Sequence, residues 1–438
     1  MNTAILTQIY KNKDLRKRLL VVVAVLVVYS FITHVPVPVP DTAKLQSFLL
    51  RLFQQSPLLG FANLFSGGAM TNFSIILMGL GPYINASIIM QLLTQVVPKL
   101  EQLNKEGEQG RNKINQYTRL LTVPLALVQS IAMLIFVQQT SIKLAGVDLI
   151  GHPSIAQWIL MIMTITGGSI LLMWLGEIIT DRGIGNGISL LILAGIVSRL
   201  PSTISQQLSL VQGDSTKIVQ LILLIALALA IIFFIVIINE GQRNIPVSYA
   251  RRVTATAGYS GVDTHLPLRV ISAGVIPIIF SLAFLSVPGF IGQLFSNAKS
   301  EWLANFAKTL SHLFAPGSLV YGITYFVLVV AFTYFYTSIV FKPEEIAENL
   351  QKQGGFIPGI RPGKETASYL KRIINRITLA GAVALGAIAV LPFILQNVFK
   401  ASASLTIGGT GLLIVVAVVI ETMKQIEARA LMATYEKY

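Results

Sequence analysis

Residues 319–341 read LVYGITYFVLVVAFTYFYTSIVF, a run without a single Asp, Glu, Lys, Arg or His. A helix needs about 20 mostly apolar residues to cross the hydrocarbon core of a bilayer. Similar stretches recur along the chain, which is 54% hydrophobic and only 12% charged, whereas soluble domains carry roughly a quarter charged residues. The pattern predicts an all-α integral membrane protein.

Ten membrane spans are predicted in total. They cover residues 19–35, 74–97, 120–138, 155–176, 184–200, 218–238, 270–290, 319–341, 377–395 and 405–420. Little sequence remains between them for a separate soluble domain, so we expect one membrane domain. Residues 1–18 are basic and precede an apolar run, as in a signal peptide, but no small-residue cleavage pattern follows. We therefore interpret 19–35 as the first span, retained in the protein.

The Lys and Arg residues are distributed unevenly between the two faces that these spans define. With the N-terminus in the cytoplasm, 25 of the 33 Lys and Arg residues fall in cytoplasmic segments. This bias is typical of membrane proteins, so we expect both termini to be cytoplasmic. The basic loops account for the net charge of +14 and are suited to contact anionic lipid or ribosomal RNA.

Ten spans divide into two sets of five, which we place at 1–200 and 201–438. Because five is odd, the second half enters the membrane inverted relative to the first. This arrangement predicts two inverted five-helix halves around a central path.

Several function classes are disfavoured by what the spans lack. We expect ionisable side chains only in loops and at span ends, whereas ion-coupled transporters use them at membrane depth. Intramembrane proteases need paired carboxylates, a Ser–His pair or metal ligands. The chain has no cysteine and no phosphate-binding P-loop motif, so we expect no catalytic residue, no cofactor and no metal. A passive conduit is favoured, and an inverted-repeat secondary transporter stays as the alternative.

One segment outside the spans is unusual. Residues 61–70 read FANLFSGGAM, a short apolar stretch interrupted by two glycines and too short to cross a bilayer. It could lie on the membrane as an interfacial helix, or it could fold back into a cavity surrounded by protein. The residues alone leave both interpretations open.

Two long charged loops are predicted on the cytoplasmic side, at 239–269 and 342–376. The second alternates charged residues with apolar residues and with Gly and Pro. This pattern indicates a structured docking surface rather than a disordered tether.

Motifs spread over nearly the whole chain resemble the SecY family of protein-conducting channels, and they occur in the family's order. They are NLFSGG at 63–68, GPYI at 81–84, KEGE at 105–108, QYTR at 116–119, GIGNGIS at 183–189, THLPL at 264–268, GVIP at 274–277, FIPGIRPG at 356–363, and GGT and LLI at 408–410 and 412–414.

The resemblance implies a channel that passes unfolded secretory polypeptides across the bacterial cytoplasmic membrane and releases membrane segments sideways between spans 2 and 7. It implies an apolar ring at the constriction, formed by Leu80, Ile84, Ile188, Ile192, Ile279 and Ile414. It also implies a plug helix at about 61–70, which includes Phe61, Asn63, Leu64, Phe65, Ser66, Gly67 and Gly68. Apolar rings can lose water and block ions while offering a passing chain no fixed partner.

The same resemblance implies partners. These are the SecE and SecG subunits, the SecA ATPase, a translating ribosome and polypeptides that carry signal sequences. Docking of SecA or the ribosome is expected at Arg243, Arg251, Arg252 and Arg361. The tip of the first loop, at 255–261, lacks the basic pair that many bacterial relatives carry, so we expect ribosome contact to depend on the three arginines nearer the loop base.

Overall fold

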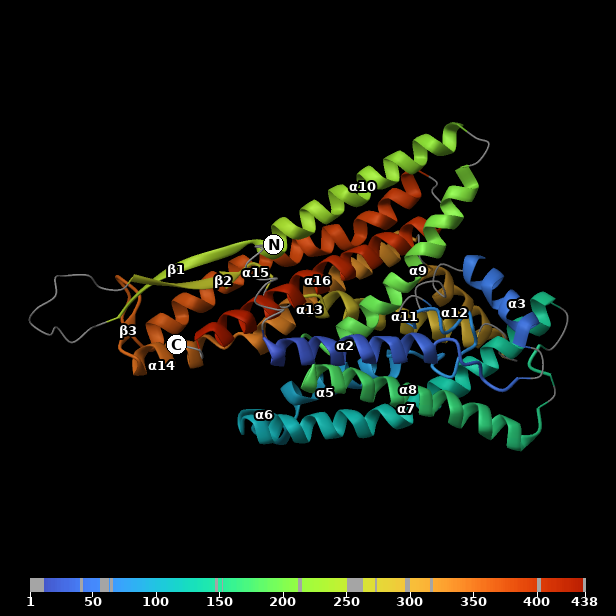
Figure 1. The fold of residues 1–438 in the computed structure, drawn as a ribbon, viewed down its shortest axis with the longest axis horizontal. Coiled ribbons are helices and arrows are strands. Elements are labelled where there is room, and N and C mark those ends of the chain that lie inside the picture. Colours follow the sequence, from blue (N-terminus) through green and yellow to red (C-terminus); the bar gives the residue numbers. More distant parts are fainter. Residues whose placement is uncertain are drawn as a thin grey trace, which may run out of the picture.

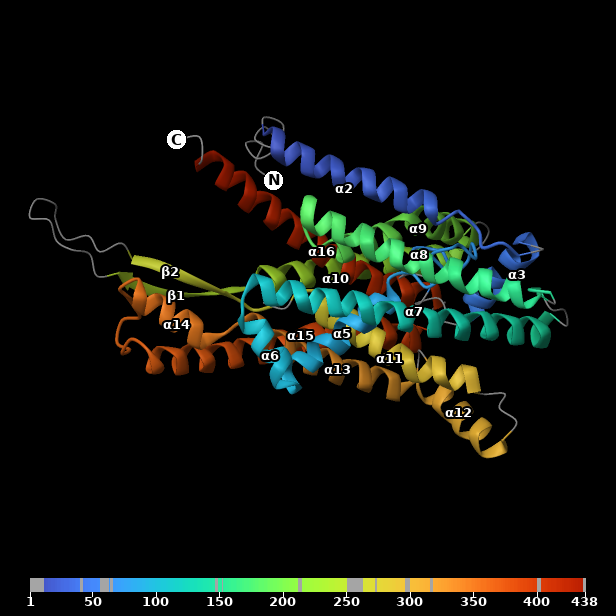
Figure 2. The same cartoon turned by 90° about the horizontal axis from the view of Figure 1, so that it is seen from below.

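The structure, a computed structural model, describes residues 12–39, 42–55, 63, 66–145, 149–151, 153–211, 215–249, 263–271, 274–295, 300–315, 318–399 and 403–435. It is a bundle of long helices that run roughly side by side, with a small sheet beyond one end (Figures 1 and 2). The first half of the chain contributes α2 (Lys13–Ile32), α3 (Thr42–Gln55), α5 (Gly81–Val96), α6 (Pro98–Lys105), α7 (Glu108–Ala145), α8 (Ile155–Arg182) and α9 (Gly187–Val211). The second half contributes α10 (Ser215–Glu240), α11 (Ile276–Phe295), α12 (Glu301–Leu313), α13 (Leu319–Val340), α14 (Pro343–Lys352), α15 (Lys364–Phe399) and α16 (Ala403–Tyr435).

Each predicted span overlaps one of these helices, so the helical prediction is confirmed. By length and composition, four segments of the described chain suffice to cross a membrane: Glu108–Ile142, Ile155–Arg182, Leu319–Lys352 and Lys364–Ile394. Shorter apolar helices cover Gly187–Ser202, Ala228–Glu240 and Ile276–Gly289.

Several predicted boundaries differ from the observed ones. Helix α5 begins at Gly81 rather than at 74, because the chain turns through Gly79 at a φ of +57° and Pro82 then starts the helix. Helix α11 begins at Ile276 rather than at 270, after Gly274 at a φ of +61°. Helix α9 continues through Pro201 to Val211, so the division between halves at 200/201 lies within a helix.

Glycines allow the helices of the first half to approach closely. A Cβ atom added at Gly187 would lie 1.8 Å from the carbonyl oxygen of Gly176, and one added at Gly168 would lie 2.1 Å from that of Ile75. Small residues serve this purpose in membrane bundles, where backbones pack directly against one another.

A three-stranded sheet lies outside the predicted spans and adds strands that the all-α prediction did not contain. The strands β1 (Gln242–Tyr249), β2 (Asp263–Arg269) and β3 (Gly355–Phe356) pair in the order β2-β1-β3. The two charged loops are therefore joined by backbone hydrogen bonds, and Ile245, Leu268 and Ile357 help to form a separate small core beneath them. The prediction of a structured cytoplasmic surface agrees with this arrangement.

The main apolar core lies at the centre of the bundle and draws on both halves of the chain. A second core joins α3, α7 and α8 in the first half, around Leu45, Leu134 and Ile165. A small cluster packs Leu15, near the start of α2, against Ile184 and Ala430, so the start of α2 and the end of α16 lie together.

Candidate functional site

The six residues predicted for the constriction all belong to the main core. Five of them are buried, with exposed fractions between 0% and 5%, and Ile188 is partly buried against the same cluster. Leu80 directly precedes α5, and the others lie on four helices: Ile84 on α5, Ile188 and Ile192 on α9, Ile279 on α11 and Ile414 on α16. The structure therefore brings branched apolar side chains from both halves into one apolar region.

One face of α9 carries much of this arrangement. Ile188, Ile192, Gly195 and Arg199 follow one another at intervals of three or four residues, which places them on one side of a helix. A Cβ atom added at Gly411 on α16 would lie 3.3 Å from Ile196, so α9 and α16 are also in close contact across the two halves.

The described part of the predicted plug lies inside the protein. Asn63 and residues 66–70 are buried, whereas Phe61, Leu64 and Phe65 lie outside the described residues. The chain that follows runs back against the end of α2, where the Ser74 hydroxyl donates to the Ile32 carbonyl oxygen at 2.8 Å. An interfacial helix would expose one face to lipid and another to water, and these buried residues do not have that pattern.

Sequence reasoning missed the role of Arg199. The expectation of charge-free spans is wrong at this residue, because Arg199 lies within the predicted span 184–200 and its side chain is only partly exposed. Its guanidinium Nη2 donates to the Thr71 hydroxyl oxygen at 2.8 Å. Thr71 was also missed, since a lone threonine after a glycine pair carries no signal of a contact so far along the chain.

An ion pair joins two helices of the first half. Arg119 on α7 donates to the Glu177 carboxylate on α8 at 2.5 Å. Glu177 lies directly after the predicted span 155–176, so the pair falls at the expected boundary of the apolar region.

The predicted docking residues are exposed where they are described. Arg361 is exposed in a turn, and its carbonyl oxygen accepts from the Thr366 hydroxyl at 2.8 Å, which fixes the turn to the start of α15. Arg243 is exposed on β1 opposite Leu268 of β2. Arg251 and Arg252 lie outside the described residues.

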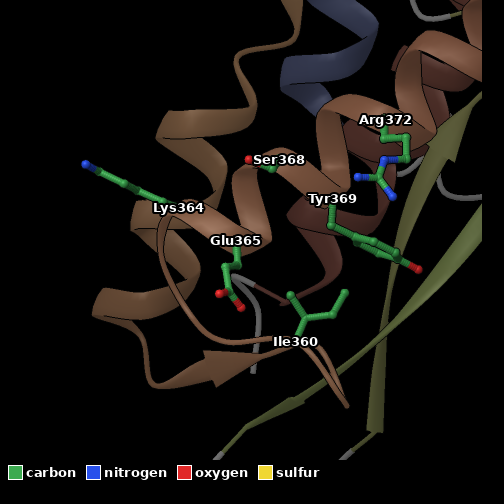
Figure 3. Close-up of a pocket in the computed structure, with 6 residues that line it drawn as sticks. All are labelled: Ile360, Lys364, Glu365, Ser368, Tyr369 and Arg372. Carbon is green, nitrogen blue, oxygen red and sulfur yellow. The ribbon is translucent and has the colours of Figure 1, made fainter.

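Two cavities open beside these loops. Figure 3 shows the smaller, about 340 Å³, where Tyr369 and Arg372 point from α15 toward the strands and Ile360 closes one side. The larger, about 1020 Å³, is lined by α13, α14 and α15 of the second half and by Lys105 of the first. Lys105 is 2.7 Å from Glu101, and this hydrogen bond lowers the pKa of the Glu101 carboxyl. Charged groups of both halves thus line this cavity.

Among the described residues, no group of three or more His, Asp or Glu side chains is arranged to hold a metal ion. The described residues instead form an apolar cluster that draws on both halves, a buried segment beside it and an exposed charged surface.

The sequence is similar to known channel subunits over almost its whole length. A model of the SecY family matches residues 74–423. Proteins called protein translocase subunit SecY from Streptomyces galbus and Corynebacterium glutamicum are 41% and 42% identical over 435 and 436 residues. A protein of the same name from Mycobacterium tuberculosis is 39% identical over 437 residues, and each match covers 98% of both chains.

The fold is similar to solved channels. A structure described as that of a protein-conducting channel has a TM-score of 0.66 at 21% identity and covers 95% of this chain and 93% of its own. A second, with a TM-score of 0.67 at 20% identity and the same coverage, concerns a SecY protein whose plug domain stabilises the closed state and maintains a membrane seal. A third is Sec61 in the canine ribosome–channel complex, with a TM-score of 0.62 at 20% identity over 95% of this chain and 93% of that one.

Proposed function

The chain belongs to the SecY family and is a multi-pass protein-translocation channel subunit rather than an enzyme, and we propose which parts form the polypeptide path, the plug and the docking surface. An inverted-repeat secondary transporter is not favoured. The proposal is that polypeptides pass between α2–α9 and α10–α16, through the apolar ring where these halves meet.

The convergence of the ring residues carries this proposal. These residues lie on four helices of both halves, or directly before one of them, and belong to one core region: Leu80, Ile84, Ile188, Ile192, Ile279 and Ile414. Branched apolar side chains at a constriction exclude water and ions at rest. They offer no hydrogen bond that would retain a polypeptide, so a chain of any sequence can pass.

We propose further that residues 61–70 form a plug that closes the ring from outside. The burial of Asn63 and of 66–70 supports this reading, and the close approach of Gly67 to Gly195 puts the segment beside the helix that carries Ile192. Glycine at these positions allows both the turn and the approach.

The cytoplasmic surface is proposed to receive the partners. Arg361 and Arg243 are exposed on two loops that share one sheet, so a partner can contact both loops at once. We propose that SecA and the translating ribosome dock here, with Arg251 and Arg252 adding charge. SecE and SecG are proposed as the accompanying membrane subunits.

We propose ten spans in the bacterial cytoplasmic membrane, with both termini in the cytoplasm. The packing of the start of α2 against the end of α16 supports an even number of spans. The bias of Lys and Arg toward the loops on that side supports their cytoplasmic orientation.

The test compares polar with apolar substitutions of two ring residues. Ile279→Asn and Ile414→Asn should wet the constriction, so that resting ion conductance and export of a substrate with a defective signal sequence both rise. Ile279→Leu and Ile414→Leu should change little, because the ring stays apolar. The channel and its partner subunits are assayed in proteoliposomes, with conductance expressed per folded channel.

Ile165→Asn is the matched control, because Ile165 is fully buried in the second core, away from the ring. It should reduce the amount of folded protein without raising conductance. If the ring Asn variants behave like this control, the six residues are ordinary packing positions and the constriction lies elsewhere.

A further inference from the structure

Arg199 lies on the same face of α9 as the ring residue Ile192, seven residues farther along the helix. At a rise of 1.5 Å per residue this separation is about 10 Å, or two turns. A charged residue within an apolar span is costly and calls for a partner.

Of the two partners, Asn63 belongs to the plug segment and Thr71 directly follows it. Arg199 Nη2 donates to the Thr71 hydroxyl oxygen at 2.8 Å, and the Asn63 side-chain amide donates to the same oxygen at 2.6 Å. The Thr71 backbone N–H donates in turn to the Asn63 side-chain oxygen at 3.2 Å. Asn63 is 2% exposed, so this chain of hydrogen bonds closes within the protein.

The backbone of the plug segment also packs closely against the Arg199 side chain. A Cβ atom at Gly68 would lie 2.8 Å from the Nε and Nη2 atoms of Arg199. One at Gly67 would lie 2.9 Å from the Cα of Gly195 and 2.0 Å from the hydroxyl oxygen of Tyr29. Gly67 and Gly68 have φ values of +62° and +92°, which side-chain-bearing residues rarely adopt. The plug segment therefore contacts the backbone of α9 at Gly195, and the Arg199 side chain packs against Gly68.

We propose that Arg199 is a positioning residue that holds the plug closed and thereby sets how strong a signal sequence must be to open the channel. The proposal rests on the assignment of 61–70 as the plug. We call the set Arg199, Thr71 and Asn63 the plug contact. Hydrogen bonds to a charged donor are stronger than neutral ones, and they strengthen further where water is excluded.

Opening need not leave an unpaired buried charge. In the closed channel the guanidinium donates to Thr71, and once the plug moves away, the same group faces the water that enters the outer half of the pore. Water then replaces Thr71 as the acceptor, so the two states differ mainly by the contacts of the plug. A signal sequence has to compete only with this limited set of interactions.

The test removes each end of the contact in turn. Arg199→Leu and Thr71→Val should each raise resting ion conductance and export of a defective-signal substrate by roughly tenfold, the effect of losing one hydrogen bond to a charged group. The double variant should exceed neither single variant by much, because both remove the same bond. Arg199→Lys keeps a charged donor and should restore part of the closure.

Thr164→Val is the matched control, since the Thr164 hydroxyl donates within its own helix, to the Leu160 carbonyl oxygen. It should leave conductance and signal selectivity unchanged. Folded channel is quantified for every variant, and Thr71→Val carries the test if Arg199→Leu lowers the yield.

Deletion of 61–70 tests the plug assignment separately from the proposed role of Arg199. If the deletion raises conductance but Arg199→Leu and Thr71→Val do not, the plug stands and the proposed role of Arg199 is wrong. If additive effects appear in the double variant, the two residues act independently and the plug contact is likewise rejected. Unchanged conductance and selectivity in the deletion itself would reject the plug assignment.

Discussion

The proposed plug segment and the proposed docking surface place arginine in opposite settings. Arg199 is partly buried, bonds Thr71 at 2.8 Å and lies over a glycine that has no room for a side chain. Arg361 and Arg243 are exposed on loops whose backbones are fixed by turns and strand pairing. The first setting suits a contact within the chain, and the second presents charge to a partner on a prepared surface. Changes at the two places should therefore affect different steps of transport.

The largest effect is expected for Arg361→Glu. Reversing this exposed charge should lower SecA-driven export more than tenfold, because a like-charge contact with a partner costs several kcal/mol. The variant should insert, assemble and remain closed normally, since Arg361 makes no contact with any ring residue. Export into membrane vesicles and resting conductance are measured together.

Lys364→Glu is the control for this prediction, since it reverses a charge three residues away, at the first residue of α15. It should reduce export much less. Equal losses in both variants would mean that net charge, rather than a contact at Arg361, governs docking. A rise in resting conductance in Arg361→Glu would show that the docking loop and the plug segment do not act independently.

A smaller effect, confined to stability, is expected for Gly187→Ala. The added methyl group would meet the Gly176 carbonyl oxygen at 1.8 Å, so α8 and α9 must move apart. Overpacking of this kind typically costs about 1–3 kcal/mol. Thermal unfolding of the purified channel should show a lowered Tm, while SecA binding to the folded protein should be unchanged.

Gly167→Ala provides the comparison within the same bundle, because no atom lies within 4 Å of the position its Cβ would take. Its Tm should stay the same or rise slightly, since alanine favours the helix. A similar fall in both variants would indicate that helix packing does not distinguish these glycines.

The smallest effect is expected for Arg243→Ala. An exposed arginine that contacts ribosomal RNA phosphate contributes about one unit to the slope of log affinity against log salt. The slope for ribosome binding should flatten by that amount, and by more when Arg251 and Arg252 are also neutralised. Alanines across 255–261 should leave it unchanged. The reverse pattern would assign ribosome contact to the loop tip.

Hydropathy predicted the helices well but located their contacts poorly. Charge-free runs such as 319–341 identify a helix because the bilayer requires that composition. The start of α5 was misplaced because residues 74–80 are apolar too, and only the positive φ at Gly79 shows that the chain turns there. The pairing of β1 with β3 was missed because it joins residues more than a hundred positions apart.

Some residues of the candidate site could be predicted from the sequence, and others could not. The ring and docking residues could be proposed from family motifs, since each motif is local in sequence. The partnership of Arg199 with Thr71 could not, because the two residues are 128 positions apart and neither belongs to a motif. Their pairing depends on where the plug segment returns to α9, which is a property of the folded bundle.

Helix α15 gives the docking surface a mechanical link to the membrane. It begins at Lys364, three residues after Arg361, and runs to Phe399 as one helix of 36 residues. Its length is about 54 Å, whereas the hydrocarbon core is about 30 Å thick. The helix can therefore act as a strut that reaches from the docking loop through the bilayer. Its proline, Pro392, lies near the far end, so the first seven turns have no built-in bending point. A force applied by a partner at the loop would tilt or shift α15 as a rigid unit. The helices that pack along it, α13 and α16, would then move with it.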